Sequence, residues 1–137
     1  IQVVYPLHLN PNVRNTVRPI LGNIKRVRLI EPLDYAPFCN LMKQSHIILT
    51  DSGGIQEEAP ALKIPVLVLR DETERPEAIK YGGVKLVGTN KDNIVKNVSL
   101  LLDSEEEYEK MSKSINPYGD GRACEYIEKI ILDYFNV

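Results

Sequence analysis

Short unbroken runs of Val, Ile and Leu recur along the chain, separated by stretches in which apolar residues return every three or four positions. Apolar runs without polar alternation are typical of parallel strands that are covered on both faces. The sequence therefore predicts strands at Gln2 to Tyr5, Val27 to Ile30, His46 to Thr50, Val66 to Leu69 and Val84 to Val87.

Helices are predicted between these strands, at Val13 to Leu21, Tyr35 to Gln44, Ile55 to Leu62 and Pro76 to Tyr81. A regular alternation of strand and helix with short links predicts a parallel sheet with right-handed crossovers. The expected fold class is α/β, with a Rossmann-like parallel sheet and flanking helices.

Beyond the last predicted strand the pattern is helical throughout. Asn90 or Thr89 can cap one helix, and Ser104 with Glu107 has the spacing of a capping box at the start of another. The final helix carries an apolar stripe that is long for packing on its own small sheet: Ala123, Tyr126, Ile127, Ile130, Ile131, Tyr134 and Phe135.

The chain has 137 residues and a net charge of −2, which offers no positive field for nucleic acid or an anionic membrane. No apolar run approaches the ~20 residues of a membrane span. Cys39 and Cys124 have no metal or redox spacing, so we expect free buried thiols in a cytosolic protein. Because the chain opens inside a predicted strand, residues 1–137 are expected to be a single partial domain of a longer protein.

Polar residues follow the third predicted strand in the segment TDSGGIQEE. Ligands of open parallel sheets bind beyond the carboxyl ends of the strands. Gly53 and Gly54 permit close backbone approach, the next helix begins there, and Ser52 adds a hydroxyl, which together predict an anion site that suits phosphate. The alternative is a plain helix cap with a flexible turn.

Two adjacent carboxylates, Glu57 and Glu58, lie just inside that helix about 100° apart, so only one can face a ligand. Either is placed to accept hydrogen bonds from ribose hydroxyls. The alternative is that both only complement the helix dipole.

Other candidates also follow strand ends. Arg75 stands just before a helix start and can hold a diphosphate, with Arg70 as its competitor and a surface ion pair as the alternative for both. Phe38 can stack on a planar base near the backbone of Leu33, although a core role is the commoner one for such an aromatic. His8 follows the first strand, where a loop histidine is usually only polar surface.

Several familiar chemistries are missing from the sequence. It has no G-x-G-x-x-G after the first strand, no Walker loop, no G-x-S-x-G turn and no cysteine or histidine cluster for a metal. No catalytic pair of carboxylates is visible. We therefore expect a binding site without metal or cofactor.

At TDSGGIQEEAP, PVLVLRDETERPEA and VKLVGT the chain resembles the non-hydrolysing UDP-N-acetylglucosamine 2-epimerases, and YPLHLNPNV, DYAPF and NPYGDGRA match that family too. The resemblance covers essentially all 137 residues, but only the C-terminal part of the family's length. It implies the C-terminal UDP-binding lobe of a two-domain glycosyltransferase-B-type fold, with the N-terminal lobe absent from this chain.

Roles for single residues are implied by the same resemblance. Ser52, Gly53, Gly54 and Arg75 would hold the diphosphate, and Glu58 rather than Glu57 would bind ribose. The uracil would be received by Phe38 and the backbone near Leu33, and His8 would belong to a second UDP-sugar site.

The family reaction interconverts UDP-N-acetylglucosamine and UDP-N-acetylmannosamine by elimination of UDP and its re-addition. The resemblance places the acids and bases of this isomerase in the N-terminal lobe, so no catalytic residue is expected in this fragment, which should be inactive alone. It also implies a cytoplasmic homodimer serving cell-surface polysaccharide biosynthesis. Two alternatives stay open, a nucleotide-sugar-binding domain of a glycosyltransferase and a non-catalytic UDP-sugar-binding module.

Overall fold

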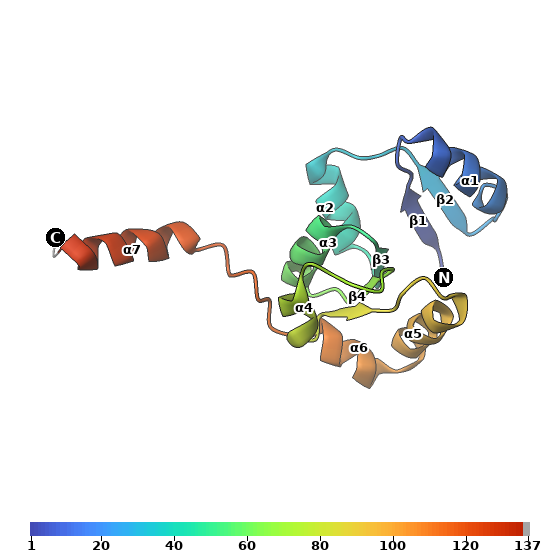
Figure 1. Cartoon of the computed structure of the whole chain (residues 1–137). Coiled ribbons are helices and arrows are strands. Elements are labelled where there is room, and N and C mark those ends of the chain that lie inside the picture. Colours follow the sequence, from blue (N-terminus) through green and yellow to red (C-terminus); the bar gives the residue numbers. More distant parts are fainter. Residues whose placement is uncertain (136–137) are drawn as a thin grey trace. The chain divides into compact units, whose positions relative to one another are not determined.

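The computed structural model describes residues 1–135, whose helices and strands are labelled in Figure 1. The chain divides into two compact units, of which the first is Ile1–Leu41 and the second begins at Met42. Backbone hydrogen bonds join strands only within a unit, so the strands form two parallel sheets where the sequence predicted one. That residues 1–137 form a single partial domain stays a prediction.

The first unit contains strand β1 (Val3–Pro6), helix α1 (Pro11–Leu21) and strand β2 (Val27–Ile30). β1 and β2 pair in parallel, with Val3 opposite Val27. Helix α1 begins after Asn10, whose side-chain oxygen accepts a hydrogen bond from the amide of Asn12 at 2.9 Å. Helix α2 (Tyr35–Lys43) follows and runs across the boundary between the units.

The sheet of the first unit is covered less than the sequence predicted. Val3 and Val4 are exposed, and no residue of β2 is fully buried. The prediction that every strand is covered on both faces is therefore wrong for this pair. The prediction was based on continuous apolar runs. Such a run indicates that a strand can be buried, but it does not show that another element covers it.

Acid should weaken the first unit through one ion pair. Arg14 on α1 pairs with Glu31, just after β2, and this hydrogen bond lowers the pKa of the Glu31 carboxyl. A lowered folded-state pKa gives stability that is present above the ordinary glutamate pKa and is lost as pH falls through the lowered value. Glu31→Gln should therefore flatten the acid limb of the unfolding free energy in urea titrations, whereas Glu128→Gln, at an exposed site on the last helix, should leave it unchanged. Identical acid limbs for Glu31→Gln and the wild type would contradict this.

The second unit is built on a three-stranded parallel sheet with β4 in the centre. Its strands are β3 (Ile48–Thr50), β4 (Val66–Val68) and β5 (Val84–Leu86). Its helices, besides the end of α2, are α3 (Gly53–Glu58), the 3₁₀ helix η1 (Ala59–Leu62), α4 (Pro76–Lys80), α5 (Lys91–Asp103), α6 (Glu105–Ser112) and α7 (Ala123–Phe135).

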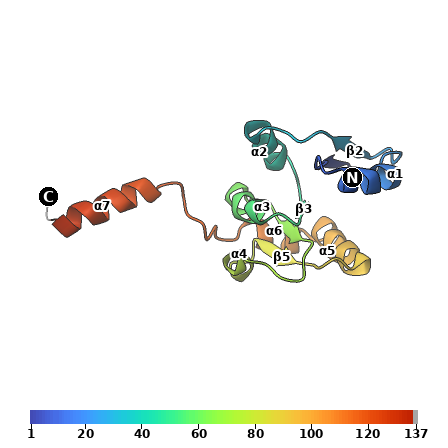
Figure 2. The same cartoon turned by 45° about the horizontal axis from the view of Figure 1, so that its top comes forward.

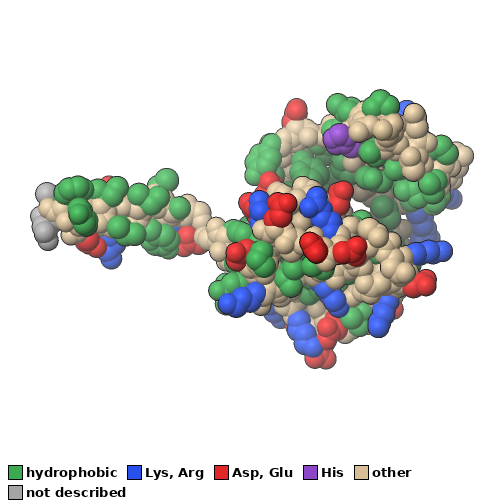
Figure 3. All heavy atoms as spheres, in the orientation of Figure 1, with side chains coloured by type: hydrophobic (Ala, Val, Ile, Leu, Met, Phe, Trp, Pro, Cys, Tyr) green, Lys and Arg blue, Asp and Glu red, His purple; other side chains and the backbone are tan. Residues whose placement is uncertain are grey.

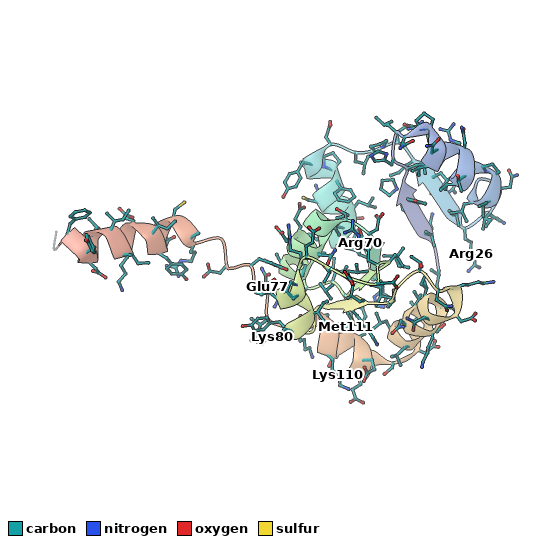
Figure 4. The ribbon with its side chains drawn as sticks, viewed as in Figure 1. Arg26, Arg70, Glu77, Lys80, Lys110 and Met111 are labelled. Carbon is teal, nitrogen blue, oxygen red and sulfur yellow. The ribbon has the colours of Figure 1, made fainter. Side chains whose placement is uncertain are left out.

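Helices cover both faces of this sheet, as Figure 1 and Figure 2 show. On one face Val66 and Val68 pack with Ala59 of η1 and Ala78 of α4. On the other face Leu67 and Val87 pack with Leu101 of α5, and Met111 of α6, labelled in Figure 4, packs against the same cluster. All three residues of β4 are fully buried, so the predicted two-sided burial is confirmed for this strand, whereas it is wrong for β3, where Leu49 is 44% exposed.

The predicted elements are all present, and their ends differ from the prediction by a few residues at most. Two predicted caps are confirmed: Asn90 accepts a hydrogen bond from the amide of Asn93 at 3.1 Å, and Ser104 accepts one from the amide of Glu107 at 3.3 Å. The fold class is α/β with Rossmann-like parallel sheets and flanking helices, as predicted.

Helix α7 presents its apolar stripe openly, and hydrophobic side chains cover much of the helix in Figure 3. Ile127 and Ile130 are 56% and 67% exposed, so the described residues supply no cover for the stripe. Both cysteines are free, but Cys39 is only half-buried and Cys124, on α7, is exposed. The prediction that both thiols are buried is therefore wrong. No helix among residues 1–135 is long and apolar enough to cross a membrane.

Candidate functional site

The turn after β3 is held open by a buried hydroxyl. Thr50 accepts a hydrogen bond from the amide of Ser52 at 3.0 Å, and Ser52 is extended, with φ −79° and ψ 133°. The hydroxyl of Ser52 makes no capping bond to α3. The amides of Gly53 and Gly54 lie in the first turn of α3, where no intrahelical acceptor exists. The turn therefore offers one hydroxyl and two amides, while the Ser52 amide is already used by the protein.

The atoms around Gly53 and Gly54 show which of the two glutamates lies near them. A methyl group placed on Gly53 would meet no atom within 4 Å. A methyl group on Gly54 would lie 3.8 Å from Oε1 of Glu58 and 3.9 Å from Oγ of Ser52. The Glu58 carboxylate and the Ser52 hydroxyl therefore flank the same point beside Gly54, which agrees with the choice of Glu58 over Glu57.

Glu57 has a different partner. Its carboxylate pairs with Nε of Arg75, in the loop between β4 and α4, and both side chains are about half-buried. The hydrogen bond to Glu57 raises the pKa of Arg75, which keeps the guanidinium charged. Nη1 of Arg75 also donates to the carbonyl of Glu74 at 3.1 Å. Arg75 is thus tied to α3 through Nε and to the Glu74 carbonyl through Nη1.

Three residues of this region were not identified as candidates from the sequence. Gln56 and Thr73 are hydrogen-bonded to each other at 2.5 Å and connect α3 with the loop that carries Arg75. The third is Tyr118, in the segment NPYGDG, which lies close enough for the charges of Glu57 and Arg75 to affect its pKa. Burial is the main cause that raises the pKa of Tyr118, followed by the negative charge of Glu77.

Arg70, the competing candidate, is exposed in the loop after β4 and is labelled in Figure 4. Its carbonyl accepts a hydrogen bond from the amide of Gly88 at 3.2 Å, and Gly88 has a φ of +65°. The positive φ disfavours a side chain at Gly88, where a methyl group would also lie 2.7 Å from Oδ1 of Asp71. Arg70 thus anchors the loop by its backbone, and Arg75 is the arginine that contacts α3.

The remaining candidates belong to the first unit. Leu33 is 39% exposed in the link after β2, and Phe38 is half-buried on α2. His8 is exposed after β1, where its Nδ1 accepts a hydrogen bond from the amide of Asn10 at 3.1 Å. The roles predicted for these three residues stay predictions. The same holds for the other candidates, which all belong to the second unit: Ser52, Gly53, Gly54, Glu58 and Arg75.

Comparison with known proteins decides the family. A family profile described as UDP-N-acetylglucosamine 2-epimerase matches residues 1–132. The chain belongs to the UDP-N-acetylglucosamine 2-epimerase family. Within this family, it is 58% identical over 132 residues to the UDP-N-acetylglucosamine 2-epimerase of Campylobacter jejuni, covering 96% of this chain and 34% of that protein. It is 61% identical over 127 residues to that of Escherichia coli K12, covering 93% of this chain and 34% of that protein.

A solved structure of this epimerase family agrees in fold. The UDP-GlcNAc 2-epimerase of Neisseria meningitidis, bound to UDP-GlcNAc, matches with a TM-score of 0.89 and 54% identity, over 97% of this chain and 36% of that one. The chain therefore spans about a third of the length of the epimerases that it matches.

Proposed function

We propose that this chain is the UDP-binding lobe of a UDP-N-acetylglucosamine 2-epimerase, an isomerase that interconverts UDP-N-acetylglucosamine and UDP-N-acetylmannosamine. Two findings support the proposal. The chain belongs to the epimerase family, and a relative of this family is described as bound to UDP-GlcNAc. The second unit also brings Ser52, Glu58 and two free helix-start amides to one turn, with Arg75 tied to the same helix.

Each of these groups has a task in that function. The amides of Gly53 and Gly54, the Ser52 hydroxyl and the Arg75 guanidinium would donate hydrogen bonds to the diphosphate. Negative charge grows on the diphosphate as UDP leaves the sugar, so these donors would stabilise the transition state as well as the bound UDP. Glu58, beside Gly54, would accept hydrogen bonds from the ribose hydroxyls.

Further roles in this proposal fall to residues of the first unit. Phe38 and the backbone near Leu33 would receive the uracil, and His8 would contact a second UDP-sugar. These roles are supported by the family resemblance and by the position of each residue near the carboxyl end of β1 or β2 or on α2.

The activity belongs to the whole protein in this proposal. We infer that the groups handling the proton at carbon 2 lie outside this chain, so the 137-residue chain should bind UDP weakly and should not epimerise. Turnover of UDP-N-acetylglucosamine by the chain alone would contradict the inference. A cytoplasmic location, a homodimer of the full-length protein and a role in cell-surface polysaccharide biosynthesis are further parts of the proposal.

Calorimetric titration with UDP tests the binding function directly. We expect the wild-type chain to bind UDP more tightly than uridine, because the donors identified here serve the diphosphate. Ser52→Ala removes one hydroxyl donor and should weaken UDP binding about threefold to tenfold, the range for one lost hydrogen bond of about 1 kcal/mol. Ser99→Ala, at an exposed serine of α5, is the matched control and should bind as the wild type. Equal affinities for UDP and uridine would contradict the proposal.

A further inference from the structure

A polar side chain is buried beside the turn. Gln56, on α3, is only 1% exposed although glutamine is usually a surface residue. Its Nε2 donates to the carbonyl of Ser52 at 3.1 Å, and its Oε1 accepts from the hydroxyl of Thr73 at 2.5 Å. Both ends of this amide are therefore bonded to a segment that carries a candidate site residue.

Thr73 carries the connection onward to Arg75. Its hydroxyl donates to Gln56 and at the same time accepts a hydrogen bond from the amide of Arg75 at 3.1 Å. Three hydrogen bonds in series thus run from the Ser52 carbonyl through Gln56 and Thr73 to the Arg75 backbone. The Glu57–Arg75 ion pair is a second, separate link between the same helix and the same loop.

Packing alone does not require this arrangement. An apolar side chain of similar size would fill the position of Gln56 without the desolvation cost of a buried amide. The amide differs from an apolar side chain because its hydrogen bonds are directional. They fix the carbonyl of Ser52 and the hydroxyl of Thr73 in one geometry. The groups fixed in this way are the carbonyl of Ser52 in the turn and the backbone of Arg75, whose guanidinium pairs with Glu57.

We propose that Gln56 and Thr73 are positioning residues that hold the Ser52–Gly54 turn and the Arg75 guanidinium at the spacing that a nucleoside diphosphate requires. This inference rests on the proposed function, because it concerns the same diphosphate site. It assigns the two residues no contact with the ligand. The effect of Gln56 on binding passes through Ser52, and the effect of Thr73 passes through Arg75.

Thr73→Val tests the proposal, because valine keeps the shape of threonine and removes only the hydroxyl. We expect Thr73→Val to weaken UDP binding about fivefold, as for one lost hydrogen bond, with no change in uridine binding. Thr73→Ser keeps the hydroxyl and should bind UDP with the wild-type affinity. Thr16→Val, which removes an exposed hydroxyl on α1, is the matched control and should have no effect. Thermal melting of each variant establishes that it is folded.

A double-mutant cycle separates positioning from direct contact. If Thr73 acts through Arg75, Thr73→Val should cost little further UDP affinity in an Arg75→Ala background. Three results would overturn the inference: unchanged UDP binding by Thr73→Val, an equal loss for uridine, or the same loss of UDP affinity with and without Arg75. A wild-type chain that does not bind UDP at all would instead overturn the proposed function, and this inference with it.

Discussion

Replacement of Arg75 by alanine should weaken UDP binding by about tenfold to 100-fold, the largest loss of affinity expected from any single change in the site. A charge-assisted hydrogen bond to a phosphate is stronger than a neutral one, and Arg75 is the cation tied to α3. Its loss also leaves the Glu57 carboxylate unpaired near the bound diphosphate, where like charges repel. Calorimetry at low and high salt measures the effect, which should shrink as salt screens the charges.

Arg70→Ala is the matched control for Arg75→Ala. Both arginines lie in the loop after β4, but Arg70 is exposed and contributes its carbonyl to the loop, which alanine retains. We expect Arg70→Ala to change UDP affinity by less than about twofold, as for a screened surface charge. A larger loss for Arg70→Ala than for Arg75→Ala would assign the diphosphate to Arg70 instead.

The strands and helices could be predicted because their signals are local. Apolar runs, caps at Asn90 and Ser104, and Pro76 at a helix start are each readable within a few residues, and the structure contains the predicted elements. Burial was predicted less well, because it depends on what covers a strand or helix. Val66 to Val68 are enclosed by helices of their own unit, whereas Val3, Val4 and the stripe of α7 are exposed.

The candidate site was predictable as far as its residues follow strand ends. Ser52, Gly53 and Gly54 follow β3 directly, and Arg75 precedes α4 after β4, so topology alone brings them to one edge. Gln56 and Thr73 gave no such signal. A glutamine inside a helix is ordinarily a surface residue, and its partner lies 17 residues further along the chain. Only the folded geometry joins them.

The choice between the two glutamates shows the same limit. Their 100° separation on a helix establishes that they face different ways, but not which way each one faces. In the structure Glu57 pairs with Arg75 and Glu58 lies beside Gly54, which supports the proposal that Glu58 is the ribose-binding residue. Nε of Arg75 pairs with Glu57 and Nη1 donates to the Glu74 carbonyl, so a bound diphosphate would be met by the guanidinium hydrogens that these two contacts do not use.

Leu67→Ala should lower the free energy of unfolding of the second unit by about 2 to 5 kcal/mol, the range for a fully buried leucine. Leu67 is the middle residue of the central strand, has no exposed surface, and packs with Val87 and Leu101. Truncation removes apolar contacts and leaves a cavity that the surrounding helices fill only partly. Since domains of this kind are stable by about 5 to 15 kcal/mol, the change should remove a large share of the total. Urea unfolding followed by circular dichroism measures it.

Leu102→Ala, at an exposed leucine of α5, makes the same chemical change without the buried contacts and should cost less than about 1 kcal/mol. Similar losses for the two variants would contradict the packed core assigned to this face of the sheet. The comparison also bears on the site, because β4 is the central strand and its end leads to the Arg75 loop. Its neighbours are β3, which leads to Ser52, and β5, which leads to Gly88. On warming, Leu67→Ala should therefore lose UDP affinity at a lower temperature than Leu102→Ala does.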